Sequence, residues 1–238
     1  MKNLLIYINP NKNFNPEHQI LAKIQIDNSL LLGWKKEDII LVTNFPYEYN
    51  GVKSTVIEDE YFCPFRPLST KTITVAHLLE YGMIEKGETY WVHDFDAYQL
   101  EPFDLKMERD AAFTTYGWSK KWCLGSYFFK DTAADIFTLI KNNIYVRKIE
   151  DERALVFMTN NNLVDRGRFD VLNITYNFGM RHVEKNYFIS ELPIKVLHFH
   201  PWGRAINTLD IFMYGKNGLN KPLMTDSLIE VFHAHGVK

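Results

Sequence analysis

The chain has 238 residues, of which 46% are hydrophobic, so it can bury a sizeable core. Its 27 basic and 29 acidic residues give a formal net charge of -2. That balance provides no broad basic surface for nucleic acid and no acidic block of the kind found in disordered tails.

The two cysteines, Cys63 and Cys123, do not have CxxC spacing, which argues against a structural zinc site or a disulfide framework. A reduced compartment fits this pattern. The first apolar run, residues 4–8, is too short for a signal-peptide core or a membrane span. We therefore expect a cytoplasmic protein with no membrane span, and the sequence leaves its oligomeric state open.

The first part of the chain alternates apolar runs with one-sided helical patterns. The expected strands cover residues 4–8, 39–42, 52–57 and 90–92, and the expected helices cover residues 16–32 and 69–81. Pro16 suits the first turn of a helix and Gly33 suits its end. Strand-helix-strand order predicts right-handed βαβ units, so we expect a Rossmann-like N-terminal half with a parallel sheet.

From Ala111 the alternation stops. Residues 111–116 and 123–129 predict two strands with no helix between them. The remaining expected elements are helices over residues 131–140, 150–158 and 227–235 and a strand over residues 194–199. No repeat, low-complexity tract or linker divides the chain. The sequence therefore predicts a single α/β domain over residues 1–238 with a mixed central sheet.

The polarity of the chain changes sharply after the strand expected at residues 90–92, where Asp94 and Asp96 stand one residue apart. Carboxylates at the carboxyl end of such a strand can share one Mg²⁺ or Mn²⁺, because hard oxygen ligands suit a hard cation. The simpler alternative is that aspartates favour turns and that Asp-x-Asp is a short pattern that occurs by chance.

A second group of candidate ligands lies near the C-terminus. His198 and His200 alternate along the last expected strand, so their side chains point to opposite faces and only one is expected to enter a given site. Imidazole is a suitable third ligand for Mn²⁺, and Arg204 places a cation nearby. The alternative is two ordinary histidines at a strand end.

Together these features resemble the GT-A fold glycosyltransferases, and in particular the family-eight type. The similarity rests on the order of a βαβ half, Asp-x-Asp, a Gly-Ser strand, an acidic helix and a late His segment followed by Pro201-Trp202. It implies a GT-A-like single domain in which Asp94, Asp96 and His198 bind Mn²⁺ (or Mg²⁺).

The resemblance also implies the reaction and its partners. The donor would be a nucleoside-diphosphate sugar, most simply a UDP-sugar, and the acceptor a carbohydrate or another hydroxyl compound. Residues 1–100 would form the nucleotide-sugar-binding half and residues 101–238 the acceptor-binding half. The enzyme would transfer a hexosyl or pentosyl group.

Two positions depart from the family pattern. The family usually has a Lys before its Pro-Trp, reaching the donor diphosphate, whereas this chain has His200 there. Arg204, after Trp202, is our substitute for that cation. The residue before the first aspartate is usually hydrophobic and is His93 here, which we expect to be a neighbour of the site and not a ligand.

Further positions follow from the resemblance. Lys71 stands where the family has a basic residue near the donor, although a solvated lysine at a helix start has the same appearance. Gly125 and Ser126 resemble the strand of small residues beneath the sugar, although glycine can also mark a bulge. Asp151 and Glu152 resemble an acidic pair that touches the sugar or acceptor and includes the catalytic carboxylate, although helix N-termini favour acidic residues anyway.

The nucleotide end is expected at the loops after the first two strands, with Ile8, Asn9 and Thr43 near the base and ribose.

Two rival functions remain from the sequence. One is a metal-dependent phosphohydrolase that uses the histidines and aspartates of both motifs, and the other is a non-catalytic carbohydrate-binding or structural protein. The residues that the phosphohydrolase would use are His93, Asp94, Asp96, His198 and His200.

Overall fold

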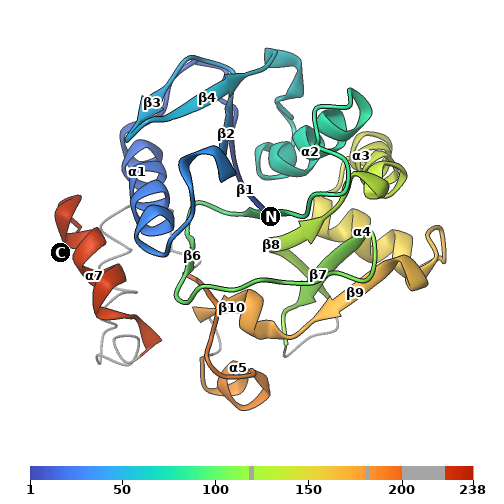
Figure 1. Cartoon of the computed structure of the whole chain (residues 1–238). Helices are drawn as coiled ribbons and strands as arrows, with labels where there is room; N and C mark the ends of the chain where they lie inside the picture. Colours follow the sequence, from blue (N-terminus) through green and yellow to red (C-terminus); the bar gives the residue numbers. More distant parts are fainter. Residues whose placement is uncertain (118–120, 181–182, 200–222, 238) are drawn as a thin grey trace.

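The computed structural model describes residues 1–117, 121–180, 183–199 and 223–237 (Figure 1). Within these residues an eight-stranded mixed sheet forms the centre of the molecule, in the order β3-β4-β2-β1-β5-β8-β7-β9. Its strands are β1 (Lys2–Tyr7), β2 (Ile39–Thr43), β3 (Glu48–Tyr49), β4 (Val52–Val56), β5 (Tyr90–His93), β7 (Ala111–Thr115), β8 (Trp122–Phe129) and β9 (Phe169–Leu172).

The sheet has a parallel part and an antiparallel part. Strands β4, β2, β1 and β5 run parallel to one another, with Leu4 opposite both Ile40 and Val92. At β5 the direction reverses, because β8 pairs antiparallel with both β5 and β7. The expected Rossmann-like N-terminal half and mixed central sheet are therefore confirmed.

Helices cover both faces of the sheet. They are α1 (Pro16–Leu31), α2 (Thr70–Glu80), α3 (Ala134–Arg147), α4 (Asp151–Asn160), α5 (Val183–Ile189) and α7 (Asp226–Ala234). In Figure 1, α1 and α7 lie together on one side, and α2, α3 and α4 on the other. Leu4 and Ile6 of β1 join the core beneath α2, α3 and α4, whereas Leu5 joins the core beneath α1 and α7. Burial on both faces explains why β1 is a continuous apolar run.

A smaller sheet of three strands lies beside the main one. It contains β10 (Phe178–Gly179), β11 (Val196–His198) and β6 (Ala97–Gln99), in that order. β11 runs antiparallel to β6 and parallel to β10. β6 begins directly after the Asp-x-Asp turn, so this small sheet brings the C-terminal part of the chain to that turn.

Most expected elements are present, with differences at their ends. α1 begins at Pro16 as predicted, because Asn15 caps it by accepting a hydrogen bond from the His18 N–H. α3 extends to Arg147, beyond the expected end at residue 140, because its apolar face continues with Ile144 in the core. The sequence did not predict β6, β9, β10 or α5, which are short elements whose residues carry little periodicity.

Candidate metal and nucleotide site

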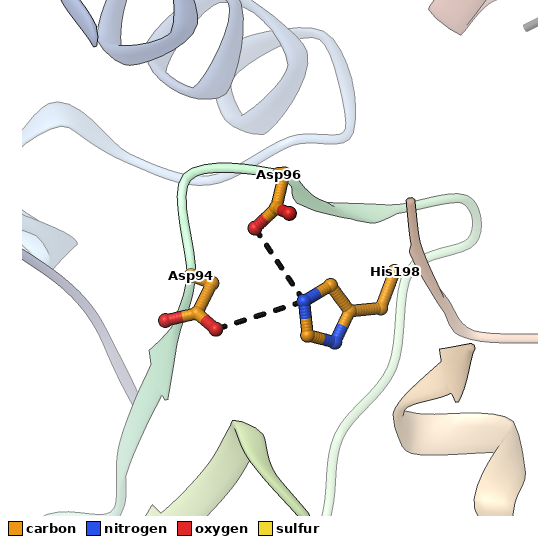
Figure 2. Close-up of side chains that lie close together, drawn as sticks. All are labelled: Asp94, Asp96 and His198. Atoms are coloured by element: carbon orange, nitrogen blue, oxygen red, sulfur yellow. Dashed lines mark ion pairs between the residues drawn. The ribbon is translucent and has the colours of Figure 1, made fainter. Parts of the chain in front are cut away.

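The Asp-x-Asp motif forms the turn between β5 and β6. The Asp94 N–H donates to the Gly125 carbonyl at 2.8 Å, and the Ala97 N–H donates back to the Asp94 carbonyl at 3.0 Å. Phe95, between the two aspartates, is buried against the Tyr7 ring. These backbone contacts fix the turn, so both carboxylates extend from it on the same side of the strand end (Figure 2).

His198 reaches the same point from β11. It stands opposite Ala97 in the antiparallel pair, and the Phe199 N–H donates to the Asp96 carbonyl at 3.0 Å. Its Nε2 lies 3.4 Å from Asp96 Oδ1 and 3.6 Å from Asp94 Oδ2 (Figure 2). The structure therefore brings together the three residues that the sequence predicted as metal ligands.

The three side chains fit a divalent cation. One ligand atom from each of Asp94, Asp96 and His198 lies within 4.8 Å of the other two. Two carboxylate oxygens and one imidazole nitrogen at these separations could hold one divalent cation, which would keep its remaining positions for water and substrate oxygens. The donor set of two carboxylates and one imidazole suits Mn²⁺ or Mg²⁺ better than a soft metal.

The electrostatics of the cluster also favour a cation. Burial of the His198 ring disfavours its charged form, but the charges of Asp96 and Asp94 and the hydrogen bonds to the ring together outweigh burial and raise the pKa of His198 to about 10. A carboxylate pair that holds a proton on a buried imidazole attracts positive charge. A divalent cation would replace that proton when it binds.

His93 has a different environment. Its Nε2 lies 2.9 Å from Asn3 Oδ1, its Nδ1 lies 3.0 Å from the Asp94 carbonyl, and its ring stacks on Trp91. Burial lowers its pKa to about 4, so the ring is neutral at physiological pH. Both nitrogens face fixed polar atoms, and the metal group among the described residues does not include His93.

Lys71 places a cation beside the cluster. It lies in the first turn of α2, and its Nζ is 2.5 Å from Asp94 Oδ1 and 2.6 Å from the Leu124 carbonyl. The side chain is largely buried, and its ammonium group also faces the Tyr127 ring at 5.5 Å. Lys71 is thus directed into the site and is not a solvated lysine at a helix start.

These groups line a cavity of about 490 Å³. Its walls come from the end of β1, the start of α2, the Asp-x-Asp turn and the start of α4. The lining residues at these places include Ile6, Tyr7, Ile8, Thr70, Lys71, Asp94, Asp96, Asp151, Glu152 and His198. The volume is within the range of small-molecule sites.

The two acidic residues at the start of α4 differ in their surroundings. Asp151 is buried, its carboxylate accepts a hydrogen bond from the Thr72 hydroxyl, and its own N–H donates to the Ser69 hydroxyl oxygen. Glu152 is less buried and accepts hydrogen bonds from the Tyr116 hydroxyl at 2.8 and 2.9 Å and from the Leu124 N–H at 3.1 Å. Burial raises the pKa of both carboxyl groups, so each binds protons more readily than an exposed carboxylate.

The other predicted donor residues occupy varied positions. Ile8 lines the cavity, whereas Asn9, Thr43 and Ser126 are not among its lining residues. The Asn9 backbone exchanges two hydrogen bonds with the Asn44 side chain just after the end of β1. The Ser126 hydroxyl is buried, where it accepts a hydrogen bond from the Trp91 indole N–H.

Gly125 lies against His198. A Cβ atom at Gly125 would lie 2.0 Å from His198 Cε1, so only glycine leaves room for this ring. The predicted phosphate-neutralising Arg204, together with His200 and the Pro201-Trp202 element, falls outside the described residues.

Sequence reasoning did not identify Tyr116, Asn177 or His18 as site residues. Tyr116 holds Glu152, Asn177 contacts His198 at 2.9 Å, and His18 lines the cavity. The position of Tyr116 at a strand end before Gly117 was a usable signal. Asn177 and His18 gave no such signal, because a single asparagine or histidine outside a motif does not indicate a site.

The sheet and the site together have a recognisable arrangement. A parallel half ends in an Asp-x-Asp turn, an antiparallel half follows, and a late histidine joins the two aspartates at one cavity. This is the arrangement of the GT-A fold, as the sequence indicated.

Comparisons with solved structures agree. The galactosyltransferase LgtC, solved with donor and acceptor sugar analogs, matches 98% of this chain and 96% of its own, with a TM-score of 0.58 and 11% identity. A glycosyltransferase involved in glycosylation of the major capsid of PBCV-1 matches 83% of this chain and 93% of its own, with a TM-score of 0.51 and 11% identity.

The glycosyltransferase GlyE of Streptococcus pneumoniae TIGR4 matches all of this chain and 64% of its own, with a TM-score of 0.57 and 13% identity. No family model and no curated protein matches the sequence. At these identities the comparisons show the fold. Among the described residues, no helix has the length and apolar character needed to span a membrane.

Proposed function

We propose that this protein is a metal-dependent glycosyltransferase that moves a sugar from a nucleoside-diphosphate donor to a carbohydrate or other hydroxyl acceptor. The observation that carries the proposal is the cluster of Asp94, Asp96 and His198 at the cavity, with Lys71 beside it. Acidic ligands and a lysine ammonium group at the end of a parallel sheet suit a diphosphate and its metal ion.

The cation would be Mn²⁺ or Mg²⁺, held by Asp94, Asp96 and His198. When bound, it stabilises the negative charge that develops on the diphosphate leaving group, without any proton transfer. The carboxylates of the Asp-x-Asp turn would place the cation at a fixed position, because the backbone hydrogen bonds of Asp94 and Ala97 hold the turn.

Lys71 would contact the diphosphate directly. Its ammonium group already lies beside Asp94 Oδ1, the oxygen that does not face His198. A short rotation of this long side chain would move its ammonium group from the Asp94 carboxylate to a phosphate oxygen of the donor. Arg204 remains our candidate for a second cation at the phosphates.

Glu152 is the better candidate of the acidic pair for contact with the transferred sugar or the acceptor hydroxyl. Its pKa is raised by burial, as is useful in a general base, and Tyr116 fixes its orientation. Asp151 is the more deeply buried of the two, and Thr72 and the Glu152 N–H both donate to its carboxylate. For a hexose or a pentose alike, Glu152 would lie on the side of the reacting sugar carbon from which the acceptor hydroxyl approaches.

We further propose that residues 1–100 hold the donor and residues 101–238 hold the acceptor. The base would lie near Ile8, with Asn9 and Thr43 at the ends of β1 and β2. Tyr7 and Phe95 offer aromatic surface at this end of the cavity. A UDP-sugar is the donor that we infer, and its binding would leave residues of α4 free to meet the acceptor.

The phosphohydrolase alternative has less support. Such enzymes place their His-Asp pairs on helices, whereas Asp94 follows a strand and His198 lies in one. His93, which that chemistry would require as a ligand, has both ring nitrogens against Asn3 and the Asp94 carbonyl.

Titration calorimetry with UDP, GDP, ADP and CDP, each with and without Mn²⁺, tests the proposal. We expect UDP to bind only when Mn²⁺ is present, with Asp96→Ala as the metal-deficient control. Sugar binding without any nucleotide would instead indicate a carbohydrate-binding module. Cleavage of simple phosphodiesters without a sugar nucleotide would favour the phosphohydrolase.

A further inference from the structure

Asn177 contacts His198 on the side away from the two aspartates. Asn177 directly precedes β10, and β10 runs parallel to β11 with Gly179 opposite His198. Its Oδ1 lies 2.9 Å from His198 Nδ1, and both side chains are almost fully buried, at 3% and 2% exposure. The contact is therefore shielded from water, which would otherwise compete for it.

The orientation of the Asn177 amide follows from its other neighbours. Its Nδ2 lies 3.0 Å from Thr114 Oγ1 and 3.5 Å from the Cys123 carbonyl. The Thr114 hydroxyl directs its own proton to the same carbonyl at 3.4 Å, so its oxygen is left to accept. Two acceptors on this side require the amide nitrogen there, and the amide oxygen must face the imidazole.

That orientation fixes the tautomer of His198. An amide oxygen can only accept, so His198 Nδ1 must carry a hydrogen, and Nε2 is the nitrogen that gives up its proton and offers a lone pair when a cation binds. Nε2 is the atom that faces Asp94 and Asp96 at 3.6 and 3.4 Å. The ring also lies against the backbone of Gly125, where no Cβ fits, so it cannot shift toward β8.

We propose that Asn177 is a positioning residue for the metal site: it holds His198 in the Nδ1–H form, with the Nε2 lone pair directed at the cation. This inference rests on the proposed metal site of the glycosyltransferase. Hydrogen bonds of this kind to a ligating imidazole orient the ring and make its free nitrogen a better donor. Asn177 itself does not contact the cation, the donor or the acceptor.

The test compares two variants of similar size. Asn177→Leu removes the acceptor, and Asn177→Asp keeps it. We expect Asn177→Leu to bind Mn²⁺ alone about 10- to 100-fold more weakly than the unaltered protein, and Asn177→Asp to bind within about threefold of it. Calorimetry with Mn²⁺ in the absence of nucleotide measures both, and thermal melting of the metal-free variants measures folding separately.

A third variant, Thr114→Val, removes the hydroxyl that orients the amide but leaves Asn177 and His198 in place. We expect a smaller loss of Mn²⁺ affinity, with melting close to that of the unaltered protein. Equal Mn²⁺ affinity in Asn177→Leu and the unaltered protein would overturn the inference while leaving the metal site intact. No Mn²⁺ binding to the unaltered protein would overturn the proposed function itself.

Magnetic resonance of the unaltered protein supplies a test that does not depend on the folding of a position-177 variant. With ¹⁵N-labelled histidine and diamagnetic Cd²⁺ as the probe, we expect the His198 signal, assigned by its loss in His198→Gln, to show hydrogen on Nδ1 and cadmium on Nε2. Cadmium on Nδ1, or hydrogen on Nε2, would contradict the proposed orientation.

Discussion

Asp94 and Asp96 lie in one short turn at the end of a parallel strand, whereas His198 reaches the same cavity from the small sheet of β6, β10 and β11. The acidic side is held by backbone hydrogen bonds of the turn and of the adjacent β8 strand. The imidazole side depends on strand pairing between distant segments and on buried side chains such as Asn177 and Thr114.

This difference has a physical consequence. A turn fixed by backbone hydrogen bonds tolerates side-chain replacement, because those hydrogen bonds remain. A buried ring held by close packing responds to changes of a single atom group. Substitutions on the acidic side should therefore remove chemistry without changing the fold, and substitutions that change the packing around the imidazole should alter metal affinity and stability together.

The largest effect is expected on the acidic side. Asp96→Ala removes one metal ligand, and donor hydrolysis and transfer should fall by at least about a thousandfold, since metal stabilisation of a leaving group contributes several kcal/mol. The melting temperature should stay close to that of the unaltered protein. Steady-state assays measure the loss, with exposed Asp104→Ala as the matched control. Unchanged turnover in Asp96→Ala would remove the metal assignment.

Next in size is the acidic pair at the start of α4. Glu152→Gln should lower the rate of transfer about a hundredfold while leaving nucleotide affinity unchanged, since general-base catalysis contributes about 10²- to 10⁴-fold. Asp151→Asn should mainly lower stability, by about 1–2 kcal/mol, because its carboxylate joins Thr72 on α2 to α4. Single-turnover rates and urea unfolding separate the two effects, and exposed Glu108→Gln is the control. A larger catalytic loss in Asp151→Asn would reverse the two roles.

On the imidazole side, Gly125→Ala should weaken Mn²⁺ binding about thirtyfold, because the added Cβ displaces His198 and loss of ligand support costs about 10- to 100-fold. It should also destabilise the fold by about 1–3 kcal/mol through overpacking. Calorimetry and thermal melting measure these losses together. Gly167→Ala is the control, since its Cβ would meet the ends of the flexible Asp165 and Arg109 side chains. Unchanged Mn²⁺ affinity in Gly125→Ala would show that metal binding does not depend on the present position of the His198 ring.

Lys71→Met should have opposite effects on two ligands. Affinity for UDP with Mn²⁺ should fall about tenfold, the size of one lost hydrogen bond to a charged group. Affinity for Mn²⁺ alone should rise slightly, because Asp94 Oδ1 no longer pairs with an ammonium group. Calorimetry of both ligands, with exposed Lys106→Met as the control, measures the changes. A loss of Mn²⁺ affinity equal to the loss of UDP affinity would contradict the proposed phosphate contact.

The smallest effect concerns pH. The Tyr116 hydroxyl donates to Glu152, and this hydrogen bond lowers the pKa of a carboxyl group that burial raises. Tyr116→Phe removes the donor, so the pKa of Glu152 should rise further. If the reaction needs ionised Glu152, the acidic limb of the pH profile of kcat should move to higher pH by less than about one unit. A shift to lower pH would exclude Glu152 as the group that must ionise.

Local sequence patterns predicted much of the fold. β1, β2 and β5 are apolar runs because both of their faces are buried, and α1 begins at Pro16 because Asn15 and Pro16 specify a helix start. The short strands β6 and β10 were not predicted, because two or three residues cannot show a period.

The candidate site was predictable to a similar extent. Asp94 and Asp96 are recognisable because their spacing and the preceding strand are local features. Lys71 and Glu152 line the cavity, yet Ser126, next to Gly125 in the chain, points away from it to Trp91. Side chains alternate along a strand, so adjacent residues of β8 cannot both face the ligand.

The sequence by itself determined the alternating α/β half and the acidic turn at its end, because burial and periodicity act between residues close in the chain. Only the tertiary structure decided that His198 joins that turn, that Gly125 makes room for its ring, and that Asn177 orients it. These contacts join segments far apart in sequence, and their geometry exists only once β6, β10 and β11 have paired.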